Sequence, residues 1–257
     1  MDLDLKDRVA LVAGSSRGIG RAIAAALLRE GCRVCISGRD PSSLHETANQ
    51  LRCDFPGRPV LEFAGDLAST TAIETALETI DRTWGGLEIL VANIGTGSGK
   101  PGYLQDESEW QRLFHLNFFG SVRLVQAAIP QMQERGGSIL FISSIVAVEA
   151  TPAPLPYSAA KAALINYAKN LSRQLAQYKI RVNCIAPGNI LFPGGSWERH
   201  LKSRREFVEQ YIEQEVPLKR FGVPEEIADL AAFIVSPRSN FSTGSCFICD
   251  GGQTRTM

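Results

Sequence analysis

The chain has 257 residues, which is enough for one or two domains. Lysine plus arginine and aspartate plus glutamate number 27 each, so the formal net charge is zero at pH 7. Proteins that bind nucleic acid or anionic membranes usually carry a basic surplus or a basic run, and this sequence has neither. No apolar run approaches a membrane span, and the acidic start of the chain lacks the layout of a signal peptide. We expect a globular cytoplasmic protein with no nucleic-acid or membrane partner.

Short apolar segments alternate with longer amphipathic segments along the whole chain. The apolar segments predict strands over 9–13, 33–37, 60–64, 87–92, 138–143, 181–186 and 245–249. The amphipathic segments predict helices over 19–30, 42–53, 70–84, 107–133, 157–178, 197–215 and 224–235. Strands that are apolar throughout and rich in Val, Ile and Leu are typical of a parallel sheet covered by helices on both faces. The alternation predicts one α/β domain over 1–257 with a doubly wound parallel sheet of about seven strands.

Two C-x-x-C pairs, Cys32 with Cys35 and Cys246 with Cys249, raise the question of a metal site. Both pairs lie on or beside predicted strands, where residues three apart point to opposite faces of the sheet. Neither pair has the turn of Gly or polar residues that a zinc knuckle needs. We interpret these cysteines as small buried apolar residues and expect neither a metal site nor a disulfide framework.

The first predicted strand runs directly into a glycine-rich turn that opens the first predicted helix. The turn has the spacing G-x-x-x-G-x-G. Glycine is needed where the backbone turns tightly or approaches a phosphate, and the N–H groups at a helix N-terminus hold a pyrophosphate. The turn therefore predicts a dinucleotide site formed by Gly14, Ser16, Arg17, Gly18, Ile19 and Gly20.

The end of the second predicted strand indicates which dinucleotide binds. Gly38 occupies the place where an acidic residue would bind the ribose hydroxyls of NAD, and Arg39 follows it. The guanidinium groups of Arg39 and Arg17 suit the 2′-phosphate of NADP. Alternatively, Arg39 is a solvated surface residue whose charge Asp40 neutralises. The exchange of an acid for an arginine favours NADP(H) over NAD(H).

Tyr157 and Lys161 lie four residues apart at the start of a predicted helix, so they share one helix face. A free tyrosine has a pKa of about 10, and a neighbouring cation lowers it. The pair predicts that Tyr157 exchanges a proton with a substrate oxygen and that Lys161 lowers the pKa of the phenol. The same spacing is also common on solvated helix faces. Ser144, however, ends the fifth predicted strand, at the sheet edge where α/β proteins bind ligands.

With these motifs in this order, residues 5–252 resemble the short-chain dehydrogenase/reductase family, in its branch of roughly 250-residue single-domain members. The resemblance implies a Rossmann-type fold and reversible hydride transfer between NADP(H) and a small-molecule carbonyl or alcohol substrate. It also implies a homo-oligomer, commonly a tetramer, packed through helices such as 107–133 and 157–178.

The resemblance further implies roles for individual residues. The catalytic tetrad maps onto Asn117, Ser144, Tyr157 and Lys161, with Asn117 supporting a proton-relaying water and Lys161 holding the nicotinamide ribose. The remaining cofactor contacts map onto Asp66, Leu67, Asn93, Gly95, Pro187, Gly188 and Ile190. Two positions depart from the family pattern. Ile94 stands at a usual Ala, and Phe192 stands where a Thr often contacts the nicotinamide carboxamide, so that hydrogen bond is lost or replaced by backbone or water.

Residues 189–220, which the family uses as a lid, are rich in aromatic and apolar side chains. They suggest an apolar or acyl-bearing ligand such as a 3-oxoacyl thioester, although any amphipathic lid helix shows such residues. The basic residues His200, Lys202, Arg204 and Arg205 fit either an anionic carrier or a solvated face. Sugars, polyols, steroids and small ketones stay open as substrates.

Two other classes of function stay open as well. One is a catalytically silent NADP(H)-binding sensor or scaffold, which the intact tetrad disfavours. The other is an S-adenosylmethionine methyltransferase, which also uses a glycine-rich first turn but would not need Tyr157 and Lys161 four residues apart. Within the superfamily that the chain resembles, enoyl reductases place this pair seven apart, so reduction of a carbon–carbon double bond is disfavoured.

Overall fold

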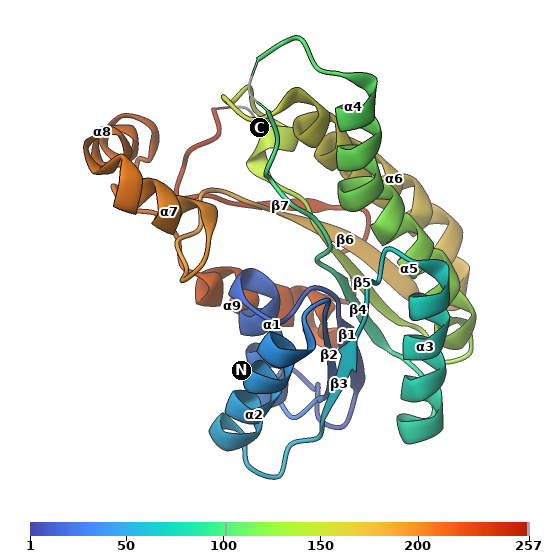
Figure 1. Ribbon diagram of the computed structural model, residues 1–257. Helices are drawn as coiled ribbons and strands as arrows, with labels where there is room; N and C mark the ends of the chain where they lie inside the picture. Colours follow the sequence, from blue (N-terminus) through green and yellow to red (C-terminus); the bar gives the residue numbers. More distant parts are fainter. Residues whose placement is uncertain (101, 256–257) are drawn as a thin grey trace.

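The computed structural model describes residues 1–100 and 102–255. Within them, seven strands form one parallel sheet in the order β3-β2-β1-β4-β5-β6-β7 (Figure 1). The strands are β1 (Val9–Val12), β2 (Arg33–Gly38), β3 (Val60–Ala64), β4 (Ile89–Ala92), β5 (Gly137–Ile142), β6 (Ile180–Pro187) and β7 (Cys246–Cys249). Every predicted strand is present with its ends shifted by no more than two residues. The predicted doubly wound parallel sheet is confirmed.

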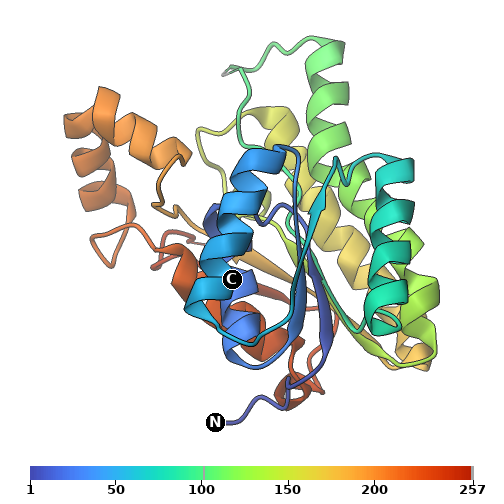
Figure 2. The ribbon, with the colours of Figure 1, turned by 60° about the horizontal axis from the view of Figure 1, so that its bottom comes forward.

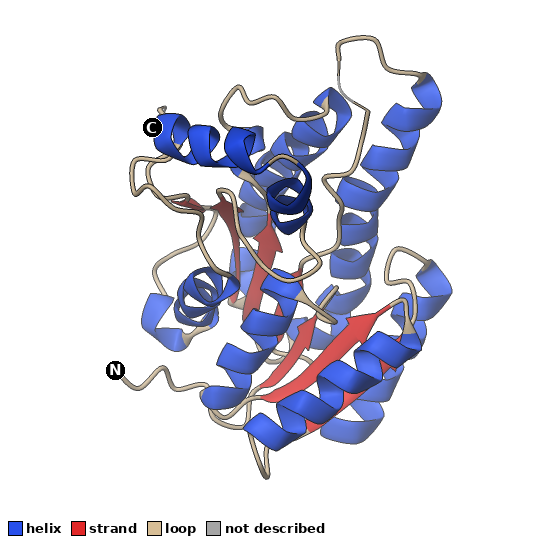
Figure 3. Cartoon of the chain, turned by 60° about the vertical axis from the view of Figure 1, so that its left-hand side comes forward, coloured by secondary structure: helices blue, strands red, loops and turns tan. Residues whose placement is uncertain are grey.

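Helices cover both faces of this sheet (Figure 1). One face carries α1 (Gly18–Arg29), α2 (Pro41–Asp54) and α9 (Pro224–Val235), and the other carries α3 (Thr70–Trp84), α5 (Gly120–Gln133) and α6 (Leu155–Leu175). Figure 2 shows the blue α1–α2 layer and the green and yellow α5–α6 layer on opposite sides, and Figure 3 shows the red strands between blue helices.

Each face of the sheet has its own hydrophobic core. Val12 of β1 packs with Leu27 of α1 in one core, whereas its neighbour Leu11 packs with Ile80 of α3 and Leu164 of α6 in the other. Successive side chains of a strand point to opposite faces, so an apolar run buried on both sides feeds both cores at once. This division explains why the strands are apolar throughout and do not alternate with polar residues.

Two predicted helices are interrupted in the structure. The helix expected over 107–133 consists of α4 (Glu107–Phe114), a π-helical turn at His115–Phe119 and then α5. The helix expected over 197–215 is two helices, α7 (Ser196–Ser203) and α8 (Arg205–Glu215). They are separated at Arg204, whose φ of −149° and ψ of 56° are not helical. The prediction of a single lid helix was therefore wrong, because the apolar pattern runs on across a residue whose backbone turns the chain.

The topology creates a crevice between β1 and β4. These strands are neighbours, but the chain leaves β1 toward α1 on one face and leaves β4 toward α4 and α5 on the other. Ligands of doubly wound sheets bind at the carboxyl ends of the strands where the order reverses. The glycine turn after β1 and Asn93 after β4 meet at this point, where Asn93 Nδ2 donates to the Gly14 carbonyl oxygen at 2.9 Å.

The six cysteines are all unpaired. Cys32 and Cys35 are fully buried, and burial raises the pKa of each thiol to about 12, so both stay protonated. Their interpretation as buried apolar residues is confirmed, whereas Cys246 and Cys249 are partly exposed. Over residues 1–100 and 102–255, no group of three or more His, Cys, Asp or Glu side chains is placed to hold a metal ion. In the same ranges, no helix is both long and apolar enough to cross a membrane.

Candidate active site

The glycine turn after β1 is held in a shape that leaves no room for larger side chains. A Cβ atom at Gly20 would lie 2.3 Å from the Gly14 carbonyl oxygen, so α1 packs against its own entry loop. Ser15 fastens the turn to the sheet, since its Oγ donates to the Val12 carbonyl oxygen at 2.6 Å and accepts from the Ser37 N–H at 2.9 Å. Arg17, the N-cap residue of α1, makes no capping hydrogen bond with its side chain, so the first N–H groups of the helix are open to an anion.

A cavity of about 580 Å³ opens over this turn. Ten of the residues predicted to bind the dinucleotide line it: Gly14, Ser16, Arg17, Gly18, Ile19, Arg39, Asp66, Leu67, Asn93 and Gly95. Gly20 lies beneath the turn, Pro187 ends β6 with Gly188 and Ile190 just beyond it, and Tyr157 and Lys161 belong to α6. The cavity therefore joins the phosphate loop, the ends of β2 and β3, the segment after β4 and the lid.

Three guanidinium groups reach this cavity, and the sequence predicted two of them. Arg17 and Arg39 line it as expected, and Arg199 of α7 joins them from the lid. Arg17 and Arg199 each donate to the Gly194 carbonyl oxygen, at 3.5 and 3.1 Å, so the two cations converge on one stretch of the wall. Asp40 accepts from the Ser42 N–H as the cap of α2, and no ion pair joins it to Arg39 in the described residues.

Arg199 is the cofactor-site candidate that sequence reasoning missed. In the sequence, Arg199 is one of several basic residues of the lid. The spacing of these residues does not show which of them faces the cavity. The basic residues that were singled out lie elsewhere. Lys202 and Arg205 form ion pairs with glutamates of their own helices, and Arg204 contacts His200 and covers the ring of Phe207.

Ser144, Tyr157 and Lys161 come together where β5 ends and α6 begins. The Ser144 hydroxyl lies beside the Tyr157 hydroxyl, near enough to lower the pKa of the phenol. Lys161 is 5% exposed, and its Nζ donates to the Ile142 carbonyl oxygen at 2.9 Å, while Ser143 Oγ donates to the Lys161 carbonyl oxygen at 3.0 Å. These two bonds fix the start of α6 against the end of β5, so the three side chains share one small volume.

Asn117 lies in the π-helical turn between α4 and α5. It is fully buried, its Nδ2 donates to the Leu113 carbonyl oxygen at 3.0 Å, and its Oδ1 accepts from the Thr96 N–H at 2.9 Å. A Cβ atom at Gly95 would lie 2.5 Å from Asn117 Oδ1 and 3.2 Å from Lys161 Nζ, so the segment after β4 passes directly over both. π-Helical turns are rare and occur often at functional sites. The structure thus brings all four predicted tetrad residues to one region.

The prediction that Lys161 makes the Tyr157 phenol unusually acidic was wrong for the protein itself. Burial raises the pKa of Tyr157, and the hydrogen bond from Ser144 only partly opposes it. Lys161 Nζ lies 6.0 Å from the centre of the Tyr157 ring, and burial lowers the pKa of Lys161 to about 8. Desolvation therefore dominates both groups. The phenol keeps its proton at neutral pH, which suits a proton donor.

Both departures from the family pattern lie at the cavity. Ile94 lines the cavity and packs against the core beneath α5 and α6, so its larger side chain is accommodated there. The Phe192 ring packs on the phosphate loop, where a Cβ atom at Gly18 would lie 2.7 Å from it. A phenyl ring offers no hydrogen bond, so Phe192 shapes the cavity wall by contact alone.

The aromatic side chains of the lid pack mainly on each other. Trp197 lies 5.2 Å from Tyr211 and 4.5 Å from Phe221 between ring centres, and Val208 and Val216 complete a small separate core. This core accounts for Leu191, Trp197 and Tyr211 among the residues that had suggested an apolar ligand, whereas Phe207 is exposed. The alternative explanation, that an amphipathic lid must bury one face, is the one the packing supports.

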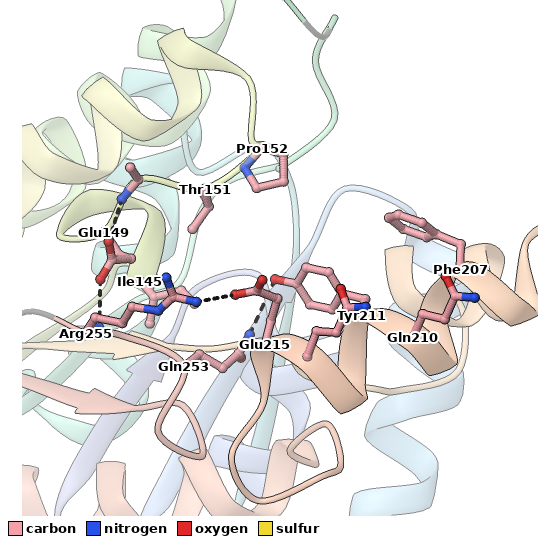
Figure 4. Close-up of a pocket in the computed structure, with 12 residues that line it drawn as sticks. Ile145, Glu149, Thr151, Pro152, Phe207, Gln210, Tyr211, Glu215, Gln253 and Arg255 are labelled. Atoms are coloured by element: carbon pink, nitrogen blue, oxygen red, sulfur yellow. Dashed lines mark hydrogen bonds and ion pairs between the residues drawn. The ribbon is translucent and has the colours of Figure 1, made fainter.

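A second cavity, of about 420 Å³, lies between the segment after Ser144, helix α8 and the C-terminal residues (Figure 4). Ile145, the residue after Ser144, forms part of its wall, as does Gln253. Gln253 Oε1 accepts from the Asn189 N–H at 2.9 Å, and Asn189 Nδ2 donates to the Tyr211 hydroxyl at 3.1 Å. The cavity is therefore lined by the residue next to Ser144 and by Gln253, which contacts the segment after β6, where the family resemblance implied cofactor contacts.

Comparisons with known proteins agree with this geometry. A family model described as enoyl-(acyl carrier protein) reductase matches residues 13–254. The 3-oxoacyl-[acyl-carrier-protein] reductase of Aquifex aeolicus (strain VF5) is 32% identical, over 98% of this chain and 100% of its own length. The crystal structure of L-sorbose reductase from Gluconobacter frateurii, complexed with NADPH and L-sorbose, has a TM-score of 0.94 at 35% identity and 100% coverage of both chains. A 7α-hydroxysteroid dehydrogenase complexed with NADH has a TM-score of 0.90 at 29% identity, over 99% of this chain and 97% of that one.

Proposed function

The chain belongs to the short-chain dehydrogenase/reductase family, and we propose that it is an NADP(H)-dependent oxidoreductase that interconverts a carbonyl group and an alcohol. One observation carries the proposal: Ser144, Tyr157 and Lys161 share one volume at the end of β5, beside a glycine-lined cavity. A Cβ atom at Gly97, which lines that cavity, would lie 3.8 Å from the Tyr157 ring, so the phenol lies next to the cavity wall.

The residues of the larger cavity fit a dinucleotide. The turn at Gly14 and Gly20 admits no larger side chain, and the uncapped N-terminus of α1 faces the opening. In the proposal this turn holds the pyrophosphate, Asp66 lies at the adenine end, and Asn93 lines the path toward Tyr157.

When bound, the nicotinamide ring supplies or accepts the hydride. In the reductive direction, Ser144 and Tyr157 hold the carbonyl oxygen by their hydroxyls, and Tyr157 gives its proton to that oxygen as negative charge develops there. Lys161 is fixed by the Ile142 carbonyl beneath this site and stabilises the phenolate that remains. Asn117, with its amide oriented by two hydrogen bonds, positions the relay that returns a proton to the site.

NADP(H) is the proposed cofactor because the cavity carries a surplus of positive charge. Arg17, Arg39 and Arg199 face it, against the carboxylates of Asp40 and Asp66. Gly38 occupies the place where an acidic residue would bind the ribose hydroxyls of NAD, and Arg39 follows it. A 2′-phosphate carries about −1.5 to −2 charges at pH 7. The solved relatives include one complexed with NADPH and one complexed with NADH, so the preference rests on these arginines.

Reduction of a carbonyl fits the site better than reduction of a carbon–carbon double bond, although the matching family model is named for enoyl reductases. Tyr157 and Lys161 are four residues apart on one helix, and the Ser144 hydroxyl lies beside the phenol. This arrangement provides two hydroxyls for one carbonyl oxygen. The relatives act on chemically different carbonyls, so the family alone does not decide the substrate.

The test is a panel of carbonyl compounds with NADPH, followed at the nicotinamide absorbance. Tyr157→Phe is expected to lower kcat by about 10²–10⁴-fold, the contribution of a positioned general acid. Tyr178→Phe, a change at an exposed tyrosine that follows α6, serves as the matched control and should leave turnover unchanged. NADPH binding by calorimetry without turnover of any compound would favour the silent sensor or scaffold, and equal activity of Tyr157→Phe would refute the proposed role of the phenol.

We also propose a homotetramer. Large apolar side chains remain exposed here, namely Trp110 and Phe119 of the predicted interface helix 107–133 at 37 and 47% of their surface, and Leu155 at the start of α6 at 46%. Light scattering should give about four times the 28.0 kDa mass of the chain, and a monomer would contradict this. The six unpaired cysteines fit the reducing cytoplasm that we propose as its location.

A further inference from the structure

Eight of the twelve described residues that line the cavity next to Ile145 have a side chain that can form hydrogen bonds. Helix α8 contributes Gln210 and Gln214, which lie one turn apart and so share a helix face, and the C-terminal segment contributes Gln253. Thr151, on the opposite wall in Figure 4, has a hydroxyl without a hydrogen-bond partner in the described residues. Each amide offers two donor hydrogens and an acceptor oxygen, so this wall matches a ligand with many hydroxyl groups.

We propose that the carbonyl substrate is a neutral, polyhydroxylated ketone of about the size of a six-carbon sugar, and that Gln210 and Gln214 recognise its hydroxyls. The proposal rests on the proposed function, because it places the reacting carbonyl at Ser144 and Tyr157 and the rest of the substrate in the second cavity. A volume of about 420 Å³ lies within the range of small-molecule sites.

The charges of this cavity favour a neutral ligand. Two carboxylates and one guanidinium belong to the described lining, and Arg255 contacts both carboxylates, one through its backbone N–H and the other through its guanidinium. The Arg255 N–H donates to Glu149 Oε2 at 2.7 Å, and Arg255 Nη2 lies 3.2 Å from Glu215 Oε2 (Figure 4). The surplus of one negative charge disfavours binding of an anionic carrier. Because the carboxylates already have partners, the glutamine amides are the groups that recognise the ligand.

The packing of the lid argues against an acyl chain or a steroid in this cavity. Trp197 and Phe221 are used in the lid's own core, and Phe192 covers the phosphate loop. The described apolar residues of the lining are Ile145, Ala150, Pro152 and Phe207, together with the ring of Tyr211. A long apolar ligand would cover Gln210 and Gln214 without giving them hydrogen-bond partners, which is costly.

The first measurement compares matched ketones with NADPH as hydride donor. L-Sorbose and D-fructose are the polyhydroxylated probes, hexan-2-one has the same six carbons without the extra hydroxyls, and S-acetoacetyl-N-acetylcysteamine is a neutral 3-oxoacyl thioester. We expect kcat/KM for at least one ketohexose to exceed that for hexan-2-one and for the thioester by about 10-fold or more, since a hydrogen bond contributes about a factor of ten.

The second measurement uses substitutions in α8. Gln210→Leu and Gln214→Leu should each lower kcat/KM for the ketohexose about 5- to 10-fold, mostly by raising KM. The kcat/KM for hexan-2-one should stay within about 2-fold of that of the unmodified protein. Both side chains are exposed, so neither change should prevent folding. Gln50→Leu, at an exposed glutamine of α2 outside the cavity, is the matched control and should leave kcat/KM for both substrates unchanged.

The outcomes separate this proposal from the proposed function. Reduction of hexan-2-one or of the thioester in preference to both ketohexoses would overturn the polyhydroxylated substrate and leave the carbonyl oxidoreductase standing. An equal loss for ketohexose and hexan-2-one in the α8 variants would overturn the role of the two glutamines. Turnover of no carbonyl compound at all would refute the proposed function itself.

Discussion

The choice between NADP(H) and NAD(H) can be tested at Arg39. Its guanidinium is exposed at the rim of the larger cavity, and no ion pair holds it within the described residues. A charge of about −2 placed about 4 Å from one positive charge gains roughly 2 kcal/mol in a medium like water, which is the appropriate limit for an exposed side chain. That energy corresponds to about a 30-fold change in affinity. Arg39→Ala should therefore raise the Kd of NADPH about 30-fold and change that of NADH by less than 2-fold.

Calorimetric titration of both nucleotides provides the measurement. Arg21→Ala is the matched control, because Arg21 is an exposed arginine in the first turn of α1 that lines a different cavity. The NADPH advantage of the unmodified protein should also shrink between 0.05 and 0.5 M salt, since exposed charges are screened. Equal weakening of NADPH and NADH by Arg39→Ala, or a preference for NADH in the unmodified protein, would refute the assignment of the 2′-phosphate to this arginine.

Three further predictions concern the neighbouring residues. Arg199→Ala should raise the Kd of NADPH about 5-fold in calorimetry, since Arg199 and Arg17 both donate to the Gly194 carbonyl oxygen. An unchanged Kd would show that Arg199 of the lid does not contribute to cofactor binding. Gly20→Ala should lower the free energy of unfolding in urea by about 1–3 kcal/mol, because its Cβ atom would lie 2.3 Å from a backbone oxygen; a stability equal to that of the original protein would contradict the tight turn. Lys161→Met should remove a pH dependence of stability, because the pKa of Lys161 is about 8 in the folded protein and higher in the unfolded chain. Above pH 8 the free energy of unfolding of the unmodified protein, relative to that of Lys161→Met, should rise by up to about 1.4 kcal/mol per pH unit. A flat difference between pH 8 and 10 would show that Lys161 is not desolvated.

The strands and the phosphate loop could be predicted because their determinants are local. An apolar run buried on both faces looks the same wherever it lies in the chain, and the glycine spacing reflects a turn within seven residues. The π-helical turn at Asn117 could not be predicted in this way. The Asn117 amide in this turn accepts a hydrogen bond from the N–H of Thr96, which lies outside the helix in the connection that follows β4. The break at Arg204 and the inward position of Arg199 likewise depend on how the lid packs on the rest of the fold.

The pKa of Tyr157 shows the same limit in energetic form. The spacing of Tyr157 and Lys161 correctly placed the two groups on one helix face, but the sign of a pKa shift depends on how much water each group loses as well as on its neighbour. Both side chains sit beneath the segment after β4, and Gly95 passes directly over Lys161. Burial therefore raises the pKa of the phenol and lowers that of the ammonium, opposite to the effect that each charge would have on the other. The phenol therefore holds its proton at neutral pH, which is the protonation state that a proton donor to a carbonyl oxygen needs.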